Sequence, residues 1–158
     1  MQENEFLKLA AEIHRDFESM PGLDYLRTVM AHKRTYPYGE LLNMDVVAAG
    51  DGTAEVSARL GYEFYNPMMR IHGGYLASLM DTALGSAIIT KLGGGQGAGT
   101  VNLNVHYVRK VDVDSSPLLA KAKVLHAGRS MLTAEAQVFD AAGNLCVHGT
   151  GTFLIYPK

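Results

Sequence analysis

The chain has 158 residues, of which 47% are hydrophobic and 19% are charged, a composition typical of one soluble globular domain. A chain of this length buries roughly 68–70% of its unfolded surface, so it needs no disulfide or metal to hold a core. The formal net charge of −2 excludes the strong basic field that would recruit nucleic acid or anionic lipid.

Cysteine content and the first residues bear on the compartment. The single cysteine, Cys146, excludes an internal disulfide framework and favours a reducing compartment, and its apolar neighbours favour a packing role. The start, MQENEFLK, lacks the basic and apolar regions of a signal peptide, and no apolar run approaches the roughly 18 residues of a membrane span. We therefore expect a cytoplasmic protein whose partners include neither membrane nor nucleic acid.

A helical extension is predicted over residues 1–39. Its expected elements are helices over 3–20 and 23–32, separated by Pro21-Gly22, and a turn at Pro37 and Gly39. The first helix carries apolar residues at helical spacing: Phe6, Leu9, Ala10, Ile13 and Phe17. Two roles stay open for this extension, which either caps a ligand pocket or packs on the sheet.

From residue 40 the hydrophobic period changes to two, and residues 40–158 are predicted to form the main domain. Strands over 41–50 and 53–64 flank the Asp51-Gly52 turn. Further along the chain we expect a helix over 75–91, closed by Gly93-Gly94-Gly95, and strands over 99–109, 118–127, 130–139 and 145–156. A strand pair, a central helix and an antiparallel meander indicate an α+β fold with one long helix packed on one sheet.

Residues 66–86, NPMMRIHGGYLASLMDTALGS, combine a glycine-rich turn with an apolar helix that carries an acid. His72-Gly73-Gly74 stands at the predicted helix start, where glycines let a ligand approach backbone N–H groups. These N–H groups have no intrahelical partner and lie at the positive end of the helix dipole, so they can hold a developing oxyanion. Asp81 lies eight residues past Gly73, and we interpret it as a base or nucleophile for the same carbonyl.

Helical periodicity places Asp81 at the border of the buried face. At about 100° per residue, Asp81 falls about 120° from the middle of an apolar stripe. That stripe consists of Leu76, Leu79, Met80, Ala83, Leu84, Ala87 and Ile88. A border position favours a functional acid, whereas an exposed Asp is by default only solvated.

Two further polar positions are candidates. Asn66 before Pro67 is either a plain turn residue or a donor to a substrate carbonyl or a water. In the strand over 99–109, alternation separates one face, Val101, Leu103, Val105 and Tyr107, from the other, Thr100, Asn102, Asn104 and His106. We assign His106 to the solvated face and retain Thr100, at the start of the strand, as a candidate.

The segment His126-Ala127-Gly128-Arg129-Ser130 joins the strands predicted over 118–127 and 130–139. A plain hairpin needs only Gly128, whereas Arg129 beside backbone N–H groups can clamp a phosphate. The sequence contains no P-loop, no GxSxG nucleophile elbow, no metal-ligand spacing and no set of aromatic residues with basic partners.

Taken together, the motifs resemble those of one family. The pattern Asn66…His72-Gly73-Gly74…Asp81, followed by TVNLNVHYVRKV, LHAGRS and AAGNLCVHGTGTF, resembles a hotdog-fold acyl-CoA thioesterase of the PaaI type, in the 4-hydroxybenzoyl-CoA thioesterase superfamily. The resemblance covers residues 40–156. It implies a sheet wrapped around one helix, and a homodimer or homotetramer with active sites at the subunit interface. It also implies no metal and no cofactor, because CoA is part of the acyl-CoA substrate.

The same resemblance implies residue roles. Gly73 supplies the oxyanion N–H, and Asp81 acts as general base or nucleophile. Asn66 and His72 orient the thioester and the water, and Thr100 helps to hold that water. The residues assigned to binding substrate and CoA are Gly74, Gly128, Arg129 and Ser130.

Two alternatives to a hydrolase stay open. An acyl-CoA hydratase or dehydratase of the same fold uses an Asp/His pair in a different segment, so the HGG motif and Asp81 argue against it. A non-catalytic acyl-CoA sensor needs an output domain, and residues 1–39 are too short and too weakly basic for a convincing helix-turn-helix.

Overall fold

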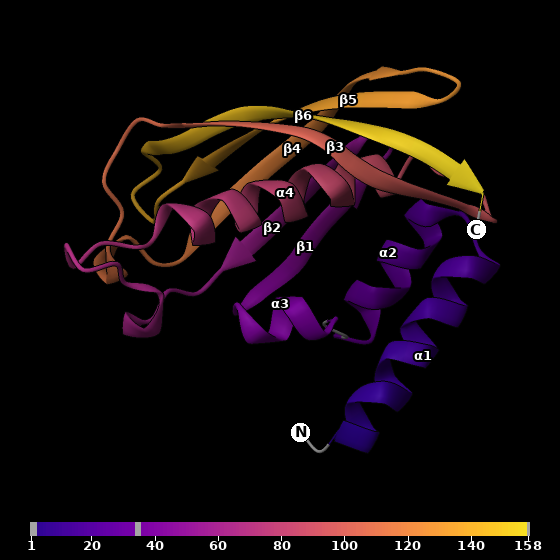
Figure 1. Ribbon diagram of the computed structural model, residues 1–158, viewed down its shortest axis with the longest axis horizontal. Helices are drawn as coiled ribbons and strands as arrows, with labels where there is room; N and C mark the ends of the chain where they lie inside the picture. Colours follow the sequence, from indigo (N-terminus) through magenta and orange to yellow (C-terminus); the bar gives the residue numbers. More distant parts are fainter. Residues whose placement is uncertain (1–2, 34–35, 158) are drawn as a thin grey trace.

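The computed structural model describes residues 3–33 and 36–157. A six-stranded antiparallel sheet curves around the long helix α4, Gly73–Ile89, and three helices precede the sheet in the chain (Figure 1). The predicted α+β fold with one central helix is confirmed. Among the described residues, no helix is both long and apolar enough to cross a membrane.

The sheet has the order β1-β2-β4-β5-β6-β3. Its strands are β1 Met44–Gly50, β2 Thr53–Ala58, β3 Gln96–Tyr107, β4 Leu118–Ala127, β5 Met131–Phe139 and β6 Leu145–Pro157. The predicted meander is correct for β4, β5 and β6 but wrong for β3, which pairs with β6. The reason is that β4 pairs with β2, so the connection over 108–117 must cross to the far side of the sheet.

The β1–β2 hairpin turns at Asp51-Gly52 as predicted, with Gly52 at a φ of +75° that favours glycine. The second strand is shorter than predicted and ends at Ala58. Its partner β4 begins at Leu118, which pairs with Ala58, so later residues have no strand to bond. The segment Tyr62–Phe64 therefore forms a 3₁₀ turn on the way to α4.

Helix α4 buries its apolar face against the sheet, and the predicted stripe is confirmed. All seven residues of the stripe are buried: Leu76, Leu79, Met80, Ala83, Leu84, Ala87 and Ile88. The helix begins two residues earlier than predicted, at Gly73, because the side chain of His72 caps it by accepting a hydrogen bond from the Gly74 N–H. At the other end it stops at Ile89, two residues before the predicted end.

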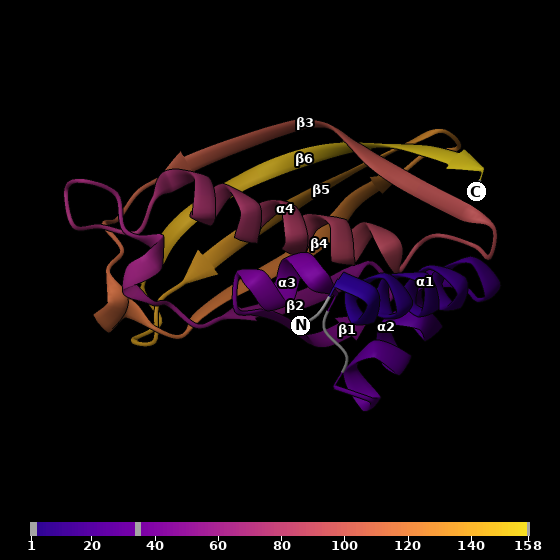
Figure 2. The same ribbon diagram turned by 60° about the horizontal axis from the view of Figure 1, so that its bottom comes forward.

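The N-terminal helices are α1 Glu3–Ser19, α2 Gly22–Ala31 and α3 Pro37–Leu41. Helix α3 replaces the turn predicted at Pro37 and Gly39, because proline fits the first helical position, where its missing N–H is not needed. Figure 2 shows α1, α2 and α3 gathered beside β1 and α4. The predicted apolar face of α1 is seen at Ile13 and Phe17, which pack against the α2 cluster, whereas the side chains of Phe6, Leu9 and Ala10 lie outside the described ones.

Candidate active site

The start of α4 leaves one backbone donor free. The Gly74 N–H donates to Nδ1 of His72 at 2.9 Å, and the Tyr75 and Leu76 N–H groups donate to the His72 carbonyl oxygen. Within the described part of the chain, the Gly73 N–H meets no acceptor. It therefore points outward at the positive end of the helix dipole, where negative charge is favoured.

The cap also fixes the proton on the exposed imidazole of His72. Because Nδ1 accepts the Gly74 N–H, a neutral ring carries its hydrogen on Nε2. Nε2 is then a hydrogen-bond donor on the residue that directly precedes Gly73.

Tyr107, at the end of β3, covers Gly73. Its hydroxyl donates to the Gly73 carbonyl oxygen at 2.9 Å, and its ring lies 3.5 Å from the place a Cβ of residue 73 would take. Sequence reasoning missed this role, because alternation assigns Tyr107 only to the apolar face of its strand. The alternation of side chains along a strand does not reveal a contact between β3 and the start of a helix 34 residues away.

Asp81 is half-buried on α4 and accepts a hydrogen bond at Oδ1 from the Thr100 hydroxyl at 2.9 Å. Its second oxygen, Oδ2, has no hydrogen-bond partner among the residues that the structure describes. The border position inferred from helical periodicity is therefore found, with one carboxylate oxygen held and the other open.

A β-bulge brings Thr100 to Asp81. The pairing of β3 with β6 shifts register between Thr100 and Asn102, so Thr100 shares the α4 side of the sheet with Leu103. Strict alternation predicted opposite faces for these two residues and was wrong. It was also wrong for Val101, which is 60% exposed.

Asn66 organises the loop before α4. Its Oδ1 accepts the N–H groups of Met68 and Arg70 at 2.9 and 3.2 Å, and Met69 takes a left-handed φ of 56°. Of the two interpretations of Asn66, the structure displays the turn. Its amide nitrogen is the atom left to act as a donor.

The turn with Gly128, Arg129 and Ser130 joins β4 to β5. Gly128 N–H donates to the Met131 carbonyl, and the Ser130 carbonyl accepts from Ile155. Figures 1 and 2 place this turn at the opposite end of the sheet from the loop before α4. Within one chain, the exposed Arg129 is therefore not brought to Gly73.

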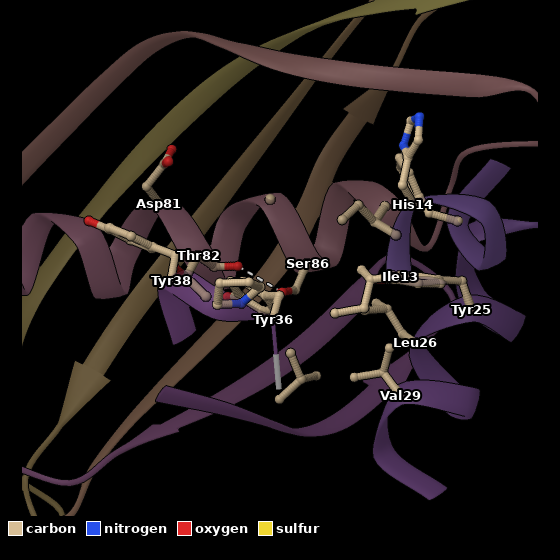
Figure 3. A pocket seen from close by; sticks show the side chains of 15 residues that line it. Ile13, His14, Tyr25, Leu26, Val29, Tyr36, Tyr38, Asp81, Thr82 and Ser86 are labelled. Carbon is tan, nitrogen blue, oxygen red and sulfur yellow. Dashed lines mark hydrogen bonds between the residues drawn. The ribbon is translucent and has the colours of Figure 1, made fainter. Parts of the chain in front are cut away.

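Next to Asp81 is a cavity of about 500 Å³ between α4 and the N-terminal helices (Figure 3). Its lining residues are Ile13, His14, Phe17, Tyr25, Leu26, Val29, Tyr36, Pro37, Tyr38, Val46, Asp81, Thr82, Gly85, Ser86 and Ile89. Burial raises the pKa of Tyr36, a hydrogen bond with Thr82 opposes this, and the charge of Asp81 adds to the rise. The sequence left open whether the extension over residues 1–39 caps a pocket or packs on the sheet. In the structure its helices do both, since they pack against β1 and line this cavity.

Helix α3 is tied to the first turns of α4 by hydroxyl groups. Tyr38 and Ser78 share a hydrogen bond of 2.8 Å, and Ser78 also donates to the Gly74 carbonyl. The Tyr75 hydroxyl donates to the Leu42 carbonyl at 2.8 Å. Among the described residues, no three His, Cys, Asp or Glu side chains are grouped as metal ligands would be.

Comparison with known proteins places these features in context. The sequence profile of the thioesterase superfamily matches residues 68–147. Conserved protein PA5202 from Pseudomonas aeruginosa is 35% identical over 79% of this chain and 98% of its own, with a TM-score of 0.72. A search among curated proteins gives no match.

Two more distant structures share the fold. The PaaI protein of E. coli, from the phenylacetic acid degradation operon, is 21% identical over 86% of this chain and 97% of its own, with a TM-score of 0.75. Thioesterase HI1161 from Haemophilus influenzae is 19% identical over 85% of this chain and 90% of its own, with a TM-score of 0.74.

Proposed function

Because the chain belongs to the thioesterase superfamily, we propose that it hydrolyses an acyl-CoA thioester to the free acid and CoA. The observation that carries this proposal is the free Gly73 N–H at the start of α4. A thioester carbonyl needs such a preorganised donor where negative charge develops, and each donor contributes about 3–4 kcal/mol to transition-state stabilisation.

Asp81 is the group that we assign to the water. As a general base, its free oxygen takes a proton while the water oxygen bonds to the thioester carbon. The carbonyl electron pair moves onto oxygen, returns as the C–S bond breaks, and the departing thiolate takes the proton from Asp81. In the second route a carboxylate oxygen of Asp81 attacks the carbon directly, the C–S bond breaks and CoA leaves as the thiolate, and water then hydrolyses the resulting anhydride to the free acid and Asp81. Thr100 holds Oδ1 in both routes.

The length of α4 bears on how the two groups meet. Gly73 and Asp81 are eight residues apart on one continuous helix, which is about 12 Å along its axis. Reacting groups must approach within about 3–3.5 Å, so one carbonyl does not reach both in a single chain. We therefore propose that Gly73 of one copy works with Asp81 of a second copy. This replaces the expectation that both groups of one chain serve the same carbonyl.

A matched pair of variants at Gly73 tests the oxyanion donor. Gly73→Pro removes the N–H yet suits the first helical position, and the extended backbone of His72 (φ −61°, ψ 136°) is compatible with a following proline. Gly73→Ala keeps the N–H, and its Cβ makes only an ordinary 3.5 Å contact with Tyr107. In a thiol-release assay we expect kcat to fall about 10²–10³-fold in Gly73→Pro and little in Gly73→Ala.

Three outcomes contradict the proposal. Equal activity of the two Gly73 variants, each with unchanged circular dichroism, removes the oxyanion role. Tight acyl-CoA binding by the parent without thiol release supports the non-catalytic sensor instead. Hydration of an enoyl-CoA without thiol release supports the hydratase alternative.

A further inference from the structure

The cavity beside Asp81 extends along α4 away from the catalytic carboxylate. The residues of α4 that line it at one-turn intervals are Asp81, Gly85 and Ile89. These positions span about 12 Å of helix axis, so the cavity is elongated and has Asp81 near one end. Figure 3 shows Asp81 and His14 at opposite ends of the lining.

The wall facing α4 comes from the N-terminal helices and is mostly apolar. Ile13 of α1 and Leu26 and Val29 of α2 lie on this wall (Figure 3). His14 is exposed, and its Nε2 atom lies 3.3 Å from a carboxylate oxygen of Glu18, so its polar end is directed to a partner on its own helix.

Apart from Oδ2 of Asp81, the polar side chains that line the cavity along α4 already have hydrogen-bond partners. Tyr36 bonds to Thr82, and the Ser86 hydroxyl donates to the Thr82 carbonyl at 2.8 Å. In the described residues, no buried side-chain polar atom lacks a partner. Beyond Asp81, a polar ligand group would therefore lose its water without gaining a hydrogen bond, whereas an apolar group is stabilised by burial.

Gly85 lines the cavity from α4 and has no side chain to occupy it. A Cβ built at Gly85 meets only the Cε1 atom of Phe153, at an ordinary 3.8 Å. Since nothing in the fold forbids a side chain there, the glycine leaves space where a larger residue would fill the cavity one turn beyond Asp81.

We propose that this cavity holds the acyl group of the substrate, and that the substrate class is acyl-CoA with an extended, uncharged aliphatic chain. The inference rests on the proposed thioester hydrolysis at Asp81. It makes the N-terminal helices the far wall of the acyl site and Gly85 a determinant of chain length. Each methylene that enters the cavity should raise kcat/KM about fourfold until the cavity is filled.

Two variants that fill the cavity from separate walls test this inference. Gly85→Leu fills it from α4, and Ile13→Trp fills it from α1. The matched control is Leu7→Trp, which adds the same indole to α1 at a residue that is 57% exposed and does not line the cavity. Kinetics of thiol release are measured with acetyl-, hexanoyl- and decanoyl-CoA, and circular dichroism checks the fold of each variant.

For the parent and Leu7→Trp we expect kcat/KM to increase from acetyl- to decanoyl-CoA. For Gly85→Leu and Ile13→Trp we expect about a tenfold or greater loss with decanoyl-CoA and less than about twofold with acetyl-CoA. Because the two substitutions lie on different helices, a folded variant of either kind decides the test. Equal losses on all chain lengths, or a parent indifferent to chain length, overturn the acyl-site inference alone. Release of CoA from benzoyl-CoA but from none of the three aliphatic substrates also overturns the acyl-site inference alone, whereas failure with all four substrates overturns the proposed function.

Discussion

At the scale of single residues, the two oxygens of Asp81 have different environments. The Thr100 hydroxyl holds Oδ1, and Oδ2 is free to meet a water or a thioester carbon. This asymmetry favours a functional role for Asp81 over that of a merely solvated acid. A solvated carboxylate needs no hydrogen-bond donor that holds one of its oxygens in place.

The first prediction concerns the basicity of Asp81. Asp81→Asn keeps the size of the side chain and its carbonyl oxygen but removes its ability to accept a proton. We expect kcat for acyl-CoA hydrolysis to fall about 10²-fold or more, with binding of a non-hydrolysable analogue retained. Asp114→Asn is the control, since Asp114 is exposed and makes no hydrogen bond to this site. Parent-like turnover by Asp81→Asn would make Asp81 a bystander.

The second prediction concerns Thr100 as a positioning residue. Thr100→Val keeps the branched shape but loses the donor to Asp81 Oδ1. Hydrogen bonds to charged groups contribute about 1.5–3 kcal/mol, so we expect a fall in kcat of about tenfold or more with KM little changed. Thr100→Ser should recover most of this loss. An equal defect in the serine and valine variants would mean that the methyl group, not the hydroxyl, matters.

At the scale of elements, the sequence predicts features that depend on residues close together in the chain, and it does not predict features that depend on distant partners. Helix α4 and its buried stripe follow from periodicity alone, and five of six strands were found in nearly the right places. The β3 bulge and the pairing of β3 with β6 were missed, since both are decided by partners distant in the chain. The hydrogen bond from Tyr107 to the Gly73 carbonyl was missed for the same reason, because the two residues are 34 positions apart.

The third prediction concerns the bond that joins α4 to the segment before β1. Burial, assisted by the charge of Glu63, raises the pKa of Tyr75 to about 12. The folded state therefore keeps a proton that the unfolded state loses above its pKa of about 10, so this contribution to stability is complete below pH 10 and falls between pH 10 and 12. Tyr75→Phe removes this pH-dependent contribution, which lowers the free energy of unfolding by up to about 1.4 kcal/mol for each pH unit between pH 10 and 12.

Urea unfolding at pH 8 to 11 measures the effect. At pH 8, Tyr75→Phe should be less stable by about 1 kcal/mol, because the Leu42 carbonyl loses its donor. Above pH 10 its stability should fall less steeply than that of the parent. Parallel pH dependences would show that the Tyr75 hydroxyl does not contribute to alkaline unfolding.

The fourth prediction concerns the hairpin with Arg129. If Arg129 clamps a phosphate of CoA, Arg129→Ala raises KM for acyl-CoA and changes kcat little, because a remote contact is mostly uniform binding. An acyl-pantetheine thioester, which lacks the nucleotide, should be unaffected. Equal losses on both substrates would assign Arg129 a structural role.

At the scale of the whole molecule, the fold class was predictable and the cavity was not. The helical spacing of α1 and α2 was visible, yet their placement against α4 depends on three-dimensional packing such as that of Gly22 on Ile89, where a Cβ would collide with the Ile89 carbonyl. The distance between Gly73 and Asp81 also depends on the three-dimensional structure. It excludes a shared carbonyl within one chain only because both residues lie on one continuous helix.

The last prediction tests whether two copies share each active site. Gly73→Pro lacks the oxyanion donor and Asp81→Asn lacks the base, so each variant alone should be nearly inactive. If every site combines Gly73 of one copy with Asp81 of another, a mixed dimer contains one intact site and one site that lacks both groups. Refolding equal amounts together gives mixed dimers as half of the population, and we expect about one quarter of parental activity.

If each chain supplied both groups to its own site, no mixed dimer would contain an intact site and activity would stay at the level of the separate variants. Light scattering on the same samples measures the oligomer directly, and a stable monomer at micromolar concentration would contradict the shared site.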